Sequence, residues 1–440
     1  MKMRKIISAG LFLLLSLSLP GGRAFGWGNT WMGAGLEQIV NGAPWKIGIL
    51  RYYAAFQLNN AGYDSDIYFG LLEKRVPDWT LSAGPDLRVL LPLKNKVVFD
   101  ISESPRYLFF LKTDRERAWN NAFSGNVHVV LNRFYFQVGG ELSNVKERLS
   151  TELNMNVRLK DETLSGLMFW QPSRDISFAL RYQRSKFAYE NQTSESVNIE
   201  EALNRTESFL DLLAYLQQQS NARVYLDAQY GSYVFAQQTA SSGRDSRSYG
   251  ISGGVQFLPP ATGFRDETSG TRGNISLGYK LLDVLDPLRK DYSGLAGNVG
   301  VSTGIMKLTA LRLFFSMGPQ FSTYTVRTYY LQTMVGAGLS RALSRKVLFT
   351  YDFGYGRNSY PAGETETGTL LEKFVDRYTT HAVQLNVRLR RDLQISLLGN
   401  MGRRHSEISI RPVSSRAFIG LSLTYGYPGG GGVMPAGPFF

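Results

Sequence analysis

The stretch His381–Met401, HAVQLNVRLRRDLQISLLGNM, decides the fold. In its first half the apolar residues Val383, Leu385 and Val387 alternate with polar ones, and only a strand places alternate side chains on opposite faces. After a tight turn at Arg391-Asp392 the alternation resumes with matched faces. The stretch therefore predicts an antiparallel β-hairpin with one apolar and one polar face, which suits either a soluble sandwich or a membrane barrel.

The same alternation recurs along nearly the whole chain, and no other predicted element covers so much apolar surface. A closed barrel in a membrane satisfies both faces and leaves no strand edge unpaired. We therefore expect an all-β fold, a transmembrane antiparallel up-and-down β-barrel of about 18 strands, with about 16 to 20 as the range. Short connections alternate with long polar ones, as periplasmic turns alternate with external loops, and an even strand count places both termini in the periplasm.

The composition agrees with a β-barrel and excludes several other classes. The chain has 440 residues, a mean hydropathy of −0.18, and 45 Gly, 24 Tyr and 26 Phe, which suit strands, tight turns and aromatic girdles. After the first residues no run approaches the roughly 18 apolar residues of a membrane helix. The cysteine count is 0, which excludes disulfides, a lipoprotein anchor, thiolate metal sites and covalently attached c-type haem.

Four segments are predicted along the chain. Residues 1–24 have a basic start, an apolar run and a Pro-Gly-Gly break, which is typical of a secretory signal peptide, so we expect the outer membrane of a Gram-negative cell as the location after cleavage. Residues 25–44 are either a periplasmic lead-in or a segment in the lumen. Residues 45–427 form the barrel, and residues 428–440 form a flexible Gly/Pro-rich tail.

The net charge favours anionic partners. It is +13 for the chain, and four cations lie in residues 1–24, which carry no acid, so 13 − 4 = +9 remains. Anionic lipid head groups, acidic polymers or small anions fit this excess. No nucleic-acid partner is expected, because no recognition module holds the charge.

Alternation assigns a set of charged side chains to the lumen, with a bias toward arginine. The basic positions are Arg51, Arg88, Arg106, Arg158, Lys160, Arg181, Arg223, Arg388 and Arg390, and the acidic positions are Asp86, Asp100, Asp211, Asp227 and Asp352. One interpretation is that these groups pair across the strands into a lining without selectivity. The other is an electropositive conduit, in which guanidinium groups lower the barrier for anions. Unbroken alternation defines the face best at Arg158, Lys160, Arg388 and Arg390.

The sequence contains few candidates for catalytic or metal-binding residues. Gly300–Gly304, GVSTG, matches the nucleophile-elbow pattern, but no helix is predicted after it, so a structural role in a strand is the better interpretation. The histidines His128, His381 and His405 show no metal spacing, and we assign His128 and His381 to polar strand faces. We therefore expect no catalytic residues, no metal and no cofactor, and keep a barrel hydrolase as the less favoured alternative.

Two stretches resemble a known family. The run Gln57–Tyr68, QLNNAGYDSDIY, and the Arg/Tyr-rich Leu180–Arg184 are similar to outer-membrane barrels of the porin group associated with PEP-CTERM and exopolysaccharide gene clusters. The resemblance implies passage of an acidic exopolysaccharide, or support of its secretion, together with periplasmic secretion components. A small-anion porin and a structural sheath for a partner protein remain as alternatives.

The last strand resembles the signal that the barrel-assembly machinery recognises in outer-membrane proteins. Gly420, Leu423 and Tyr425 have the expected spacing, whereas Phe418 stands where a polar residue is usual. The final residue, Phe440, is aromatic but follows a tail. Outer-membrane lipid and the assembly machinery are therefore expected partners.

Overall fold

The computed structural model describes residues 31–69, 75–94, 96–148, 152, 155–190, 193–194, 197–219, 222–236, 243–257, 270–287, 289–324, 327–364, 370–407 and 413–428. The predicted signal peptide, residues 25–30 of the predicted lead-in and residues 429–440 of the predicted tail lie outside these ranges.

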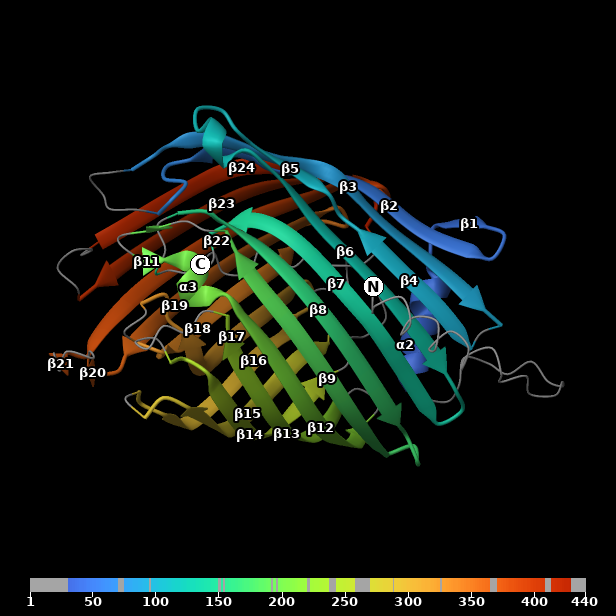
Figure 1. Ribbon diagram of the computed structural model, residues 1–440. Helices are drawn as coiled ribbons and strands as arrows, with labels where there is room; N and C mark the ends of the chain where they lie inside the picture. Colours follow the sequence, from blue (N-terminus) through green and yellow to red (C-terminus); the bar gives the residue numbers. More distant parts are fainter. Residues whose placement is uncertain are drawn as a thin grey trace, which may run out of the picture.

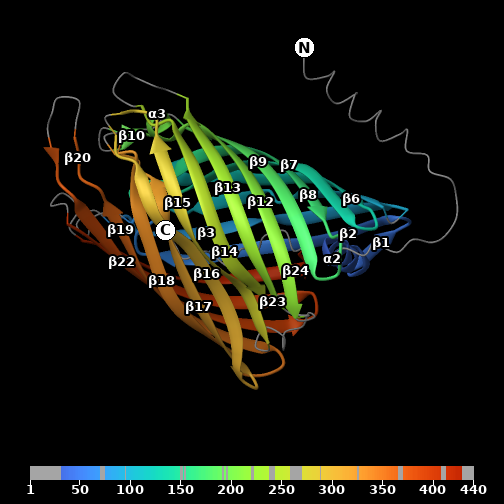
Figure 2. The ribbon, with the colours of Figure 1, turned by 90° about the horizontal axis from the view of Figure 1, so that it is seen from below.

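The strands form one antiparallel sheet that closes on itself as a barrel (Figure 1 and Figure 2). Neighbours along the chain pair with one another, and the first long strand closes the barrel on the last. The strands are β1 (Trp45–Ile47), β2 (Leu50–Asp64), β3 (Asp78–Leu93), β4 (Val97–Glu103), β5 (Arg106–Phe110), β6 (Ala118–Val130), β7 (Phe134–Glu147), β8 (Val157–Trp170), β9 (Ile176–Tyr189), β12 (Arg205–Gln219), β13 (Ala222–Phe235), β14 (Ser246–Phe257), β15 (Thr271–Val284), β16 (Tyr292–Met306), β17 (Thr309–Phe321), β18 (Tyr329–Ala342), β19 (Val347–Tyr360), β22 (Phe374–Arg390), β23 (Leu393–Ser406) and β24 (Val413–Tyr427).

The wall has 18 strands, which confirms the predicted fold class and count. The sheet contains 20 strand segments, but β1 only folds back on β2, and β4 and β5 are two parts of one wall strand, so 20 − 2 = 18. β4 and β5 are separated at Ser104 and Pro105, where proline has no N–H to give to the ladder.

The two faces of the wall differ in polarity as the alternation predicts. Large apolar side chains point outward in the middle of the strands, for example Leu226 with 64% of its surface exposed and Ile251 with 65%. Their neighbours Asp227 and Ser252 have the opposite strand parity and line the lumen side. A barrel exposing this much apolar surface is stable in lipid and not in water.

The two ends of the barrel carry different connections. At the short-turn end, strands are joined by residues 94–96, 131–133, 171–175, 307–308, 343–346 and 391–392, and both ends of the wall lie there. The connection from Phe257 to Thr271 is the long exception at this end. The opposite end, here named the loop end, carries the longer connections that follow β2, β5, β7, β9, β13, β15, β17, β19 and β23.

Two predicted boundaries were wrong near the loop end. The sequence alternation predicts one long strand, or two short ones, over about residues 150–170, whereas β8 begins only at Val157. The alternation also predicts a loop over residues 356–376, whereas β19 continues to Tyr360 and β22 starts at Phe374. Inward Asn358 and Tyr360 are fully buried. The strands therefore extend beyond the bilayer because their inner face packs against the folded-in loops.

The remaining elements are small. Helix α2 (Trp31–Asn41) precedes the barrel, and helix α3 (Ile199–Leu203) and the 3₁₀ turn η2 (Asp114–Glu116) lie in loop-end connections, as do the two-stranded pairs β10 (Thr193–Ser194) with β11 (Val197–Asn198) and β20 (Gly363–Glu364) with β21 (Leu370–Leu371). No helix in the described ranges is long and apolar enough to cross a membrane.

Candidate functional site

Helix α2 lies inside the barrel at the short-turn end (Figure 1). Its Leu36 and Val40 are buried against lumen-facing side chains of β3, β4, β6, β7, β8, β9 and β12. The Tyr53 hydroxyl of β2 donates a hydrogen bond to the carbonyl oxygen of Ile39, at 2.6 Å. Gln38 and Ile39 are exposed. Residues 31–41 of the predicted lead-in thus occupy part of the lumen.

The wall beside α2 carries charges that are compensated in pairs. The Arg88 guanidinium donates two hydrogen bonds to Asp100, at 2.9 Å and 2.7 Å, and both side chains are largely buried. On the next part of the wall Arg181 Nε lies 2.6 Å from Asp211 Oδ2, and Gln229 donates to the other oxygen of Asp211. These four residues were predicted to line the lumen, and the structure places them there as ion pairs.

The remaining predicted acids also face the lumen. Arg106 donates to Gln57 Oε1 at 2.9 Å, and the amide of Gln57 donates to Asp86 at 3.2 Å, so Gln57 bridges a cation and an anion. Asp227 shares its face with buried Arg223 on β13. Positive and negative charges on this side of the lumen are therefore close to balanced. This matches, for this part of the wall, the interpretation from sequence in which charged groups pair across the strands.

Two of the predicted lumen cations lie on the other face of the wall. Val157 of β8 is fully buried against α3, and Phe169 at the far end of β8 is buried against α2, so the odd-numbered residues face inward. Arg158 and Lys160 therefore point outward, and the prediction for them was wrong. The inner face of β8 is apolar here because the connection that holds α3 folds into the barrel and packs on it.

Three further predicted cations lie at or near the short-turn end. Arg51 donates to the carbonyl oxygens of Gly48 and Leu50 at the start of β2. Arg390 is exposed beside the turn, with its Nε 3.3 Å from Asp392 Oδ1, so it does not line the interior as predicted. Arg388 shares the inward face of β22 with Asn386, which is buried.

At the loop end, connections that are distant in sequence meet over the lumen. Glu152, with 2% of its surface exposed, accepts hydrogen bonds from the Ser322 hydroxyl at 2.7 Å and from the Thr323 N–H at 2.6 Å. Arg244, also fully buried, donates to the carbonyl oxygens of Ala202 and Thr328. Four connections are thus tied together, and we name this set of six residues the loop latch.

Burial shifts the pKa values of groups in these connections. Burial lowers the pKa of Arg244 to about 9, and nearby Arg205 acts in the same direction. It raises the pKa of Glu152, against the hydrogen bonds from Thr323 and Ser322, which lower it. Burial also raises the pKa of Tyr68 to about 12, where its hydroxyl donates to Glu116 at 2.8 Å.

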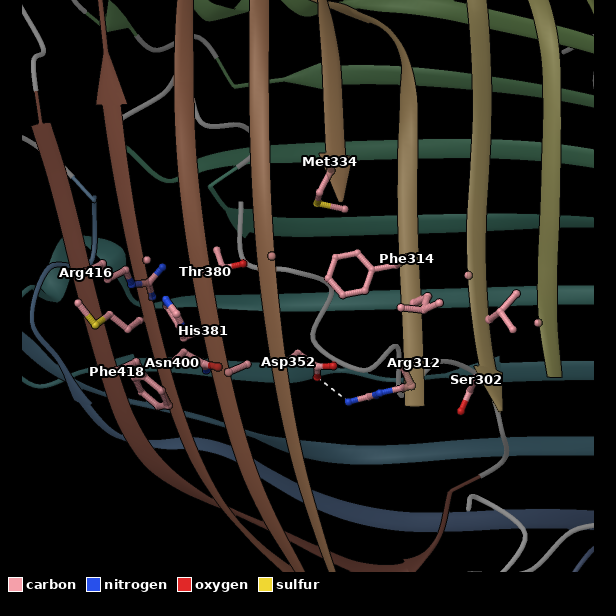
Figure 3. A pocket seen from close by; sticks show the side chains of 18 of the residues that line it. Ser302, Arg312, Phe314, Met334, Asp352, Thr380, His381, Asn400, Arg416 and Phe418 are labelled. Carbon is pink, nitrogen blue, oxygen red and sulfur yellow. Dashed lines mark hydrogen bonds and ion pairs between the residues drawn. The ribbon is translucent and has the colours of Figure 1, made fainter. Parts of the chain in front are cut away.

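A cavity of about 600 Å³ remains along the wall opposite α2 (Figure 3). It extends from Phe257, Arg272 and Ser302 near the short-turn end to Phe69, Arg148 and Arg416 near the loop end. Strands β14 to β19 and β22 to β24 supply most of its lining. We name this space the lumen cavity.

The lumen cavity combines guanidinium groups with apolar surface. Arg312 lies 2.6 Å from Asp352, the contact drawn in Figure 3. Arg416 donates to both carboxylate oxygens of Asp64. Charged side chains lining the cavity are Arg148, Arg272, Arg312 and Arg416 with Asp352, and its apolar side chains include Phe69, Phe257, Phe314, Met334 and Phe418.

Phe314 lies flat against the wall because two facing residues are glycine. A Cβ on Gly336 would come within 2.0 Å of the Phe314 ring, and the ring also passes Gly354. These glycines therefore keep the aromatic ring from projecting further into the lumen cavity.

Sequence reasoning missed all four arginines of this cavity, Arg148 in the connection after β7 and three on strands. Arg272 lies on β15, whose alternation is diluted by glycine, and Arg312 lies on β17, where apolar residues occupy both faces. Arg416 is predicted from sequence only as the first residue of the last strand, over residues 416–427. The available signal was its position two residues from Phe418, a buried residue on the same inward face.

The motif at Gly300–Gly304 does not form a nucleophile elbow. It lies inside β16, which turns back into β17, and Ser302 lines the lumen cavity. The ring of His381 is hydrogen-bonded to the Tyr351 hydroxyl at 2.9 Å and packs on Phe353, on the outward face of the wall, contrary to the polar face predicted for it. Within the described ranges no group of three or more His, Cys, Asp or Glu side chains has a metal-binding arrangement.

Fold and lumen together define a porin-type barrel of the outer membrane: apolar outside, polar inside, with short turns at one end and long loops at the other. The family model "Putative beta-barrel porin 2" matches residues 132–425, and the chain belongs to this family. A search of curated protein sequences found no match.

Solved structures with a similar shape include outer-membrane proteins of Pseudomonas aeruginosa. OpdK is 11% identical, with 85% of this chain and 98% of that chain covered and a TM-score of 0.48. OccK2 (OpdF) in complex with glucuronate is 10% identical, with the same coverages and a TM-score of 0.49. The siderophore receptor PirA is 8% identical over 86% of this chain and 80% of that chain, with a TM-score of 0.41.

Proposed function

We propose that this porin passes small organic anions through the lumen cavity. The observation that carries the proposal is the charge of the lining, four arginines against one aspartate. Arg312 and Arg416 are paired with Asp352 and Asp64, as the arginines beside α2 are paired with acids, so the excess positive charge of the lining comes from Arg148 and Arg272. The field along the open side of the lumen is therefore positive.

A positive lining favours anions because charges in a narrow tube surrounded by lipid are screened less than on an open surface. Guanidinium groups replace part of the hydration shell of a carboxylate or phosphate, and their planar donors bind it in two places. The apolar side chains that share the cavity, such as Phe314, Met334 and Phe418, contact the carbon skeleton of an organic anion.

The size of the free space favours small solutes. Helix α2 fills one side of the lumen at the short-turn end, and the loop latch covers part of it at the loop end. Passage of an acidic exopolysaccharide, predicted from the resemblance, needs a continuous track for a polymer. Passage of such a polymer remains a prediction, and so does the role of a sheath for a partner protein. No observation in the described ranges favours either one.

The proposal includes no chemistry on the solute. A barrel hydrolase needs a nucleophile in contact with a base, and no hydrogen bond joins Ser302 to a histidine within the described ranges. The ring of His381, the histidine among the residues that line the cavity, is hydrogen-bonded to the Tyr351 hydroxyl instead.

The test is solute flux into proteoliposomes that contain the full-length protein. Benzoate and benzylammonium have similar size and opposite charge, and benzoate should enter faster. Arg272→Gln should reduce the benzoate preference, whereas Asp352→Asn should increase it, because each removes one charge from the same lining. Arg174→Gln, an exposed change in a short turn, serves as the control and should leave the ratio unchanged.

Faster entry of benzylammonium would overturn the proposal, as would equal responses to Arg272→Gln and Asp352→Asn. Absence of flux for both solutes, with the protein folded in the vesicles, would contradict an open channel.

A further inference from the structure

The outward face of β8 and β9 carries a cluster of cations close to the loop end. Arg158 and Lys160 lie on β8, and Arg184 and Lys186 lie on β9. Arg181 and Ser185 point inward on β9, so Arg184 and Lys186, of the other parity, point outward. We name these four residues the basic patch.

The four cations are neighbours on one surface. Leu164 is directly across from Arg184, and Glu162 is directly across from Lys186. Glu162 is the one acid among the outward residues of β8 and β9 in the described part of these strands. The basic patch therefore carries an excess of positive charge on the outside of the wall.

The patch lies directly beyond the apolar belt of the barrel. On β8 the outward residues that follow it toward the short-turn end are Leu164 and Met168, with 55% and 43% of their surface exposed. On β9 they are Tyr182 and Leu180, with 42% and 43%. Side chains at the edge of such a belt reach the lipid head groups.

From this position we propose that the basic patch binds the phosphate groups of lipids in the membrane leaflet at the loop end. Arginine forms paired hydrogen bonds with phosphate, and lysine adds a point charge. Neighbouring outward Thr206 and Ser208 of β12, directly across from Lys186 and Arg184, supply hydroxyl donors at the same level. Lipid binding here accounts for the presence of Arg158 and Lys160 on the outer face.

A second cluster at the same end supports a lipid over a protein partner. Arg357 of β19 is directly across from Arg377 of β22, and Arg403 lies on the same outward face of β23. Like charges that face each other across strands destabilise a sheet unless an anion lies between them. Arg377 has one such partner, Glu407 at 2.9 Å. A lipid leaflet surrounds the whole barrel and can contact cation clusters on separate parts of the wall. A protein partner would cover only one side of it.

The test counts lipids retained by the full-length protein in detergent, by native mass spectrometry with diphosphoryl lipid A as the probe. Changing Arg158, Lys160, Arg184 and Lys186 together to Gln should remove at least one bound lipid A. The affinity for it should fall by about tenfold or more, since each cation near an anionic lipid surface adds a several-fold attraction. The matched control changes Arg174, Arg345 and Lys346, exposed in the short turns, to Gln and should retain every lipid.

Unchanged lipid retention in the fourfold variant would overturn the proposal. Displacement of lipid A by inorganic phosphate at an equal phosphate concentration would also overturn it, because free phosphate would then be the occupant. Folding of each variant is checked by its altered gel migration without heating. If the fourfold variant does not fold, the single Lys160→Gln variant replaces it and should also weaken lipid A retention.

Discussion

At the scale of single residues, neighbouring positions on one strand meet different surroundings. Leu385 and Gln384 on β22 illustrate this, since Leu385 shares the outward face with Val383 and Gln384 donates to Asn386 inside the barrel. Leu385→Arg should destabilise the barrel by about 2 to 4 kcal/mol, because it places a charge at mid-membrane depth. Gln384→Arg should cost much less. Denaturant unfolding in lipid vesicles measures both, and a larger cost for Gln384→Arg would mean that the faces are inverted.

The outward position of Arg158 changes what its removal should do. Arg388→Gln should lower anion selectivity, because Arg388 lies on the lumen face of β22. Arg158→Gln should leave selectivity unchanged, because its guanidinium donates to Asn144 and to the Trp119 carbonyl on the outer face. Reversal potentials of the two single variants in planar bilayers decide the matter. A loss of anion selectivity in Arg158→Gln would show that Arg158 faces the lumen after all.

At the scale of elements, α2 restricts the short-turn end through a few apolar contacts. Changing Leu36 and Val40 to Glu should release the helix from the wall, because two buried apolar side chains would become charged. The single-channel conductance should then rise. Gln38→Glu, on the exposed side of the same helix, is the control. An unchanged conductance in the double variant would show that α2 does not limit the passage.

The loop latch should respond to pH through Glu152. Its pKa is raised in the folded latch, so the stabilisation from this group is present at low pH and is lost as pH rises through the raised pKa. Tyr330, Tyr360 and Arg244 are the titratable groups that face it. The open probability of the channel should therefore increase with pH, and Glu152→Gln should keep the low-pH behaviour throughout. The exposed Glu201→Gln should retain the pH dependence, and a variant at Glu152 that still follows pH would contradict this account.

The strand pattern was predictable from sequence where strands cross the bilayer. Alternation predicts a strand over residues 176–189, where β9 lies, and it places the turn between β22 and β23 correctly at Arg391-Asp392. Period two is enforced there because lipid lies on one side of the wall and a polar lumen on the other. Beyond the bilayer the rule fails, since the outer face of β8 meets head groups and the inner face of Val157 packs on α3. On this part of β8 the apolar residues of the alternating pattern therefore face inward, and the charged residues face outward.

The lumen cavity was less predictable for a different reason. Its arginines come from β15, β17 and β24 together with the connection after β7, and their association depends on barrel closure rather than on any local motif. The compensated pairs were partly foreseeable, because Arg88 and Asp100 as well as Arg181 and Asp211 appear among the predicted lumen residues. The position of α2 was needed to decide which charged side chains face the free space of the lumen.

At the scale of the whole molecule, the barrel has an asymmetric interior. One side is filled by α2 and ion-paired wall residues, and the other is an arginine-lined cavity with apolar surface. The outer surface has an apolar belt with cations at its loop-end edge. Such a molecule is anchored by lipid on the outside and selects by charge on the inside.

The most direct test of this account is the reversal potential of the full-length protein in a planar bilayer under a steep KCl gradient. We predict the sign expected for chloride selectivity, because arginines outnumber acids along the open side of the lumen. A potential of the cation-selective sign, or no measurable conductance through inserted protein, would contradict the account.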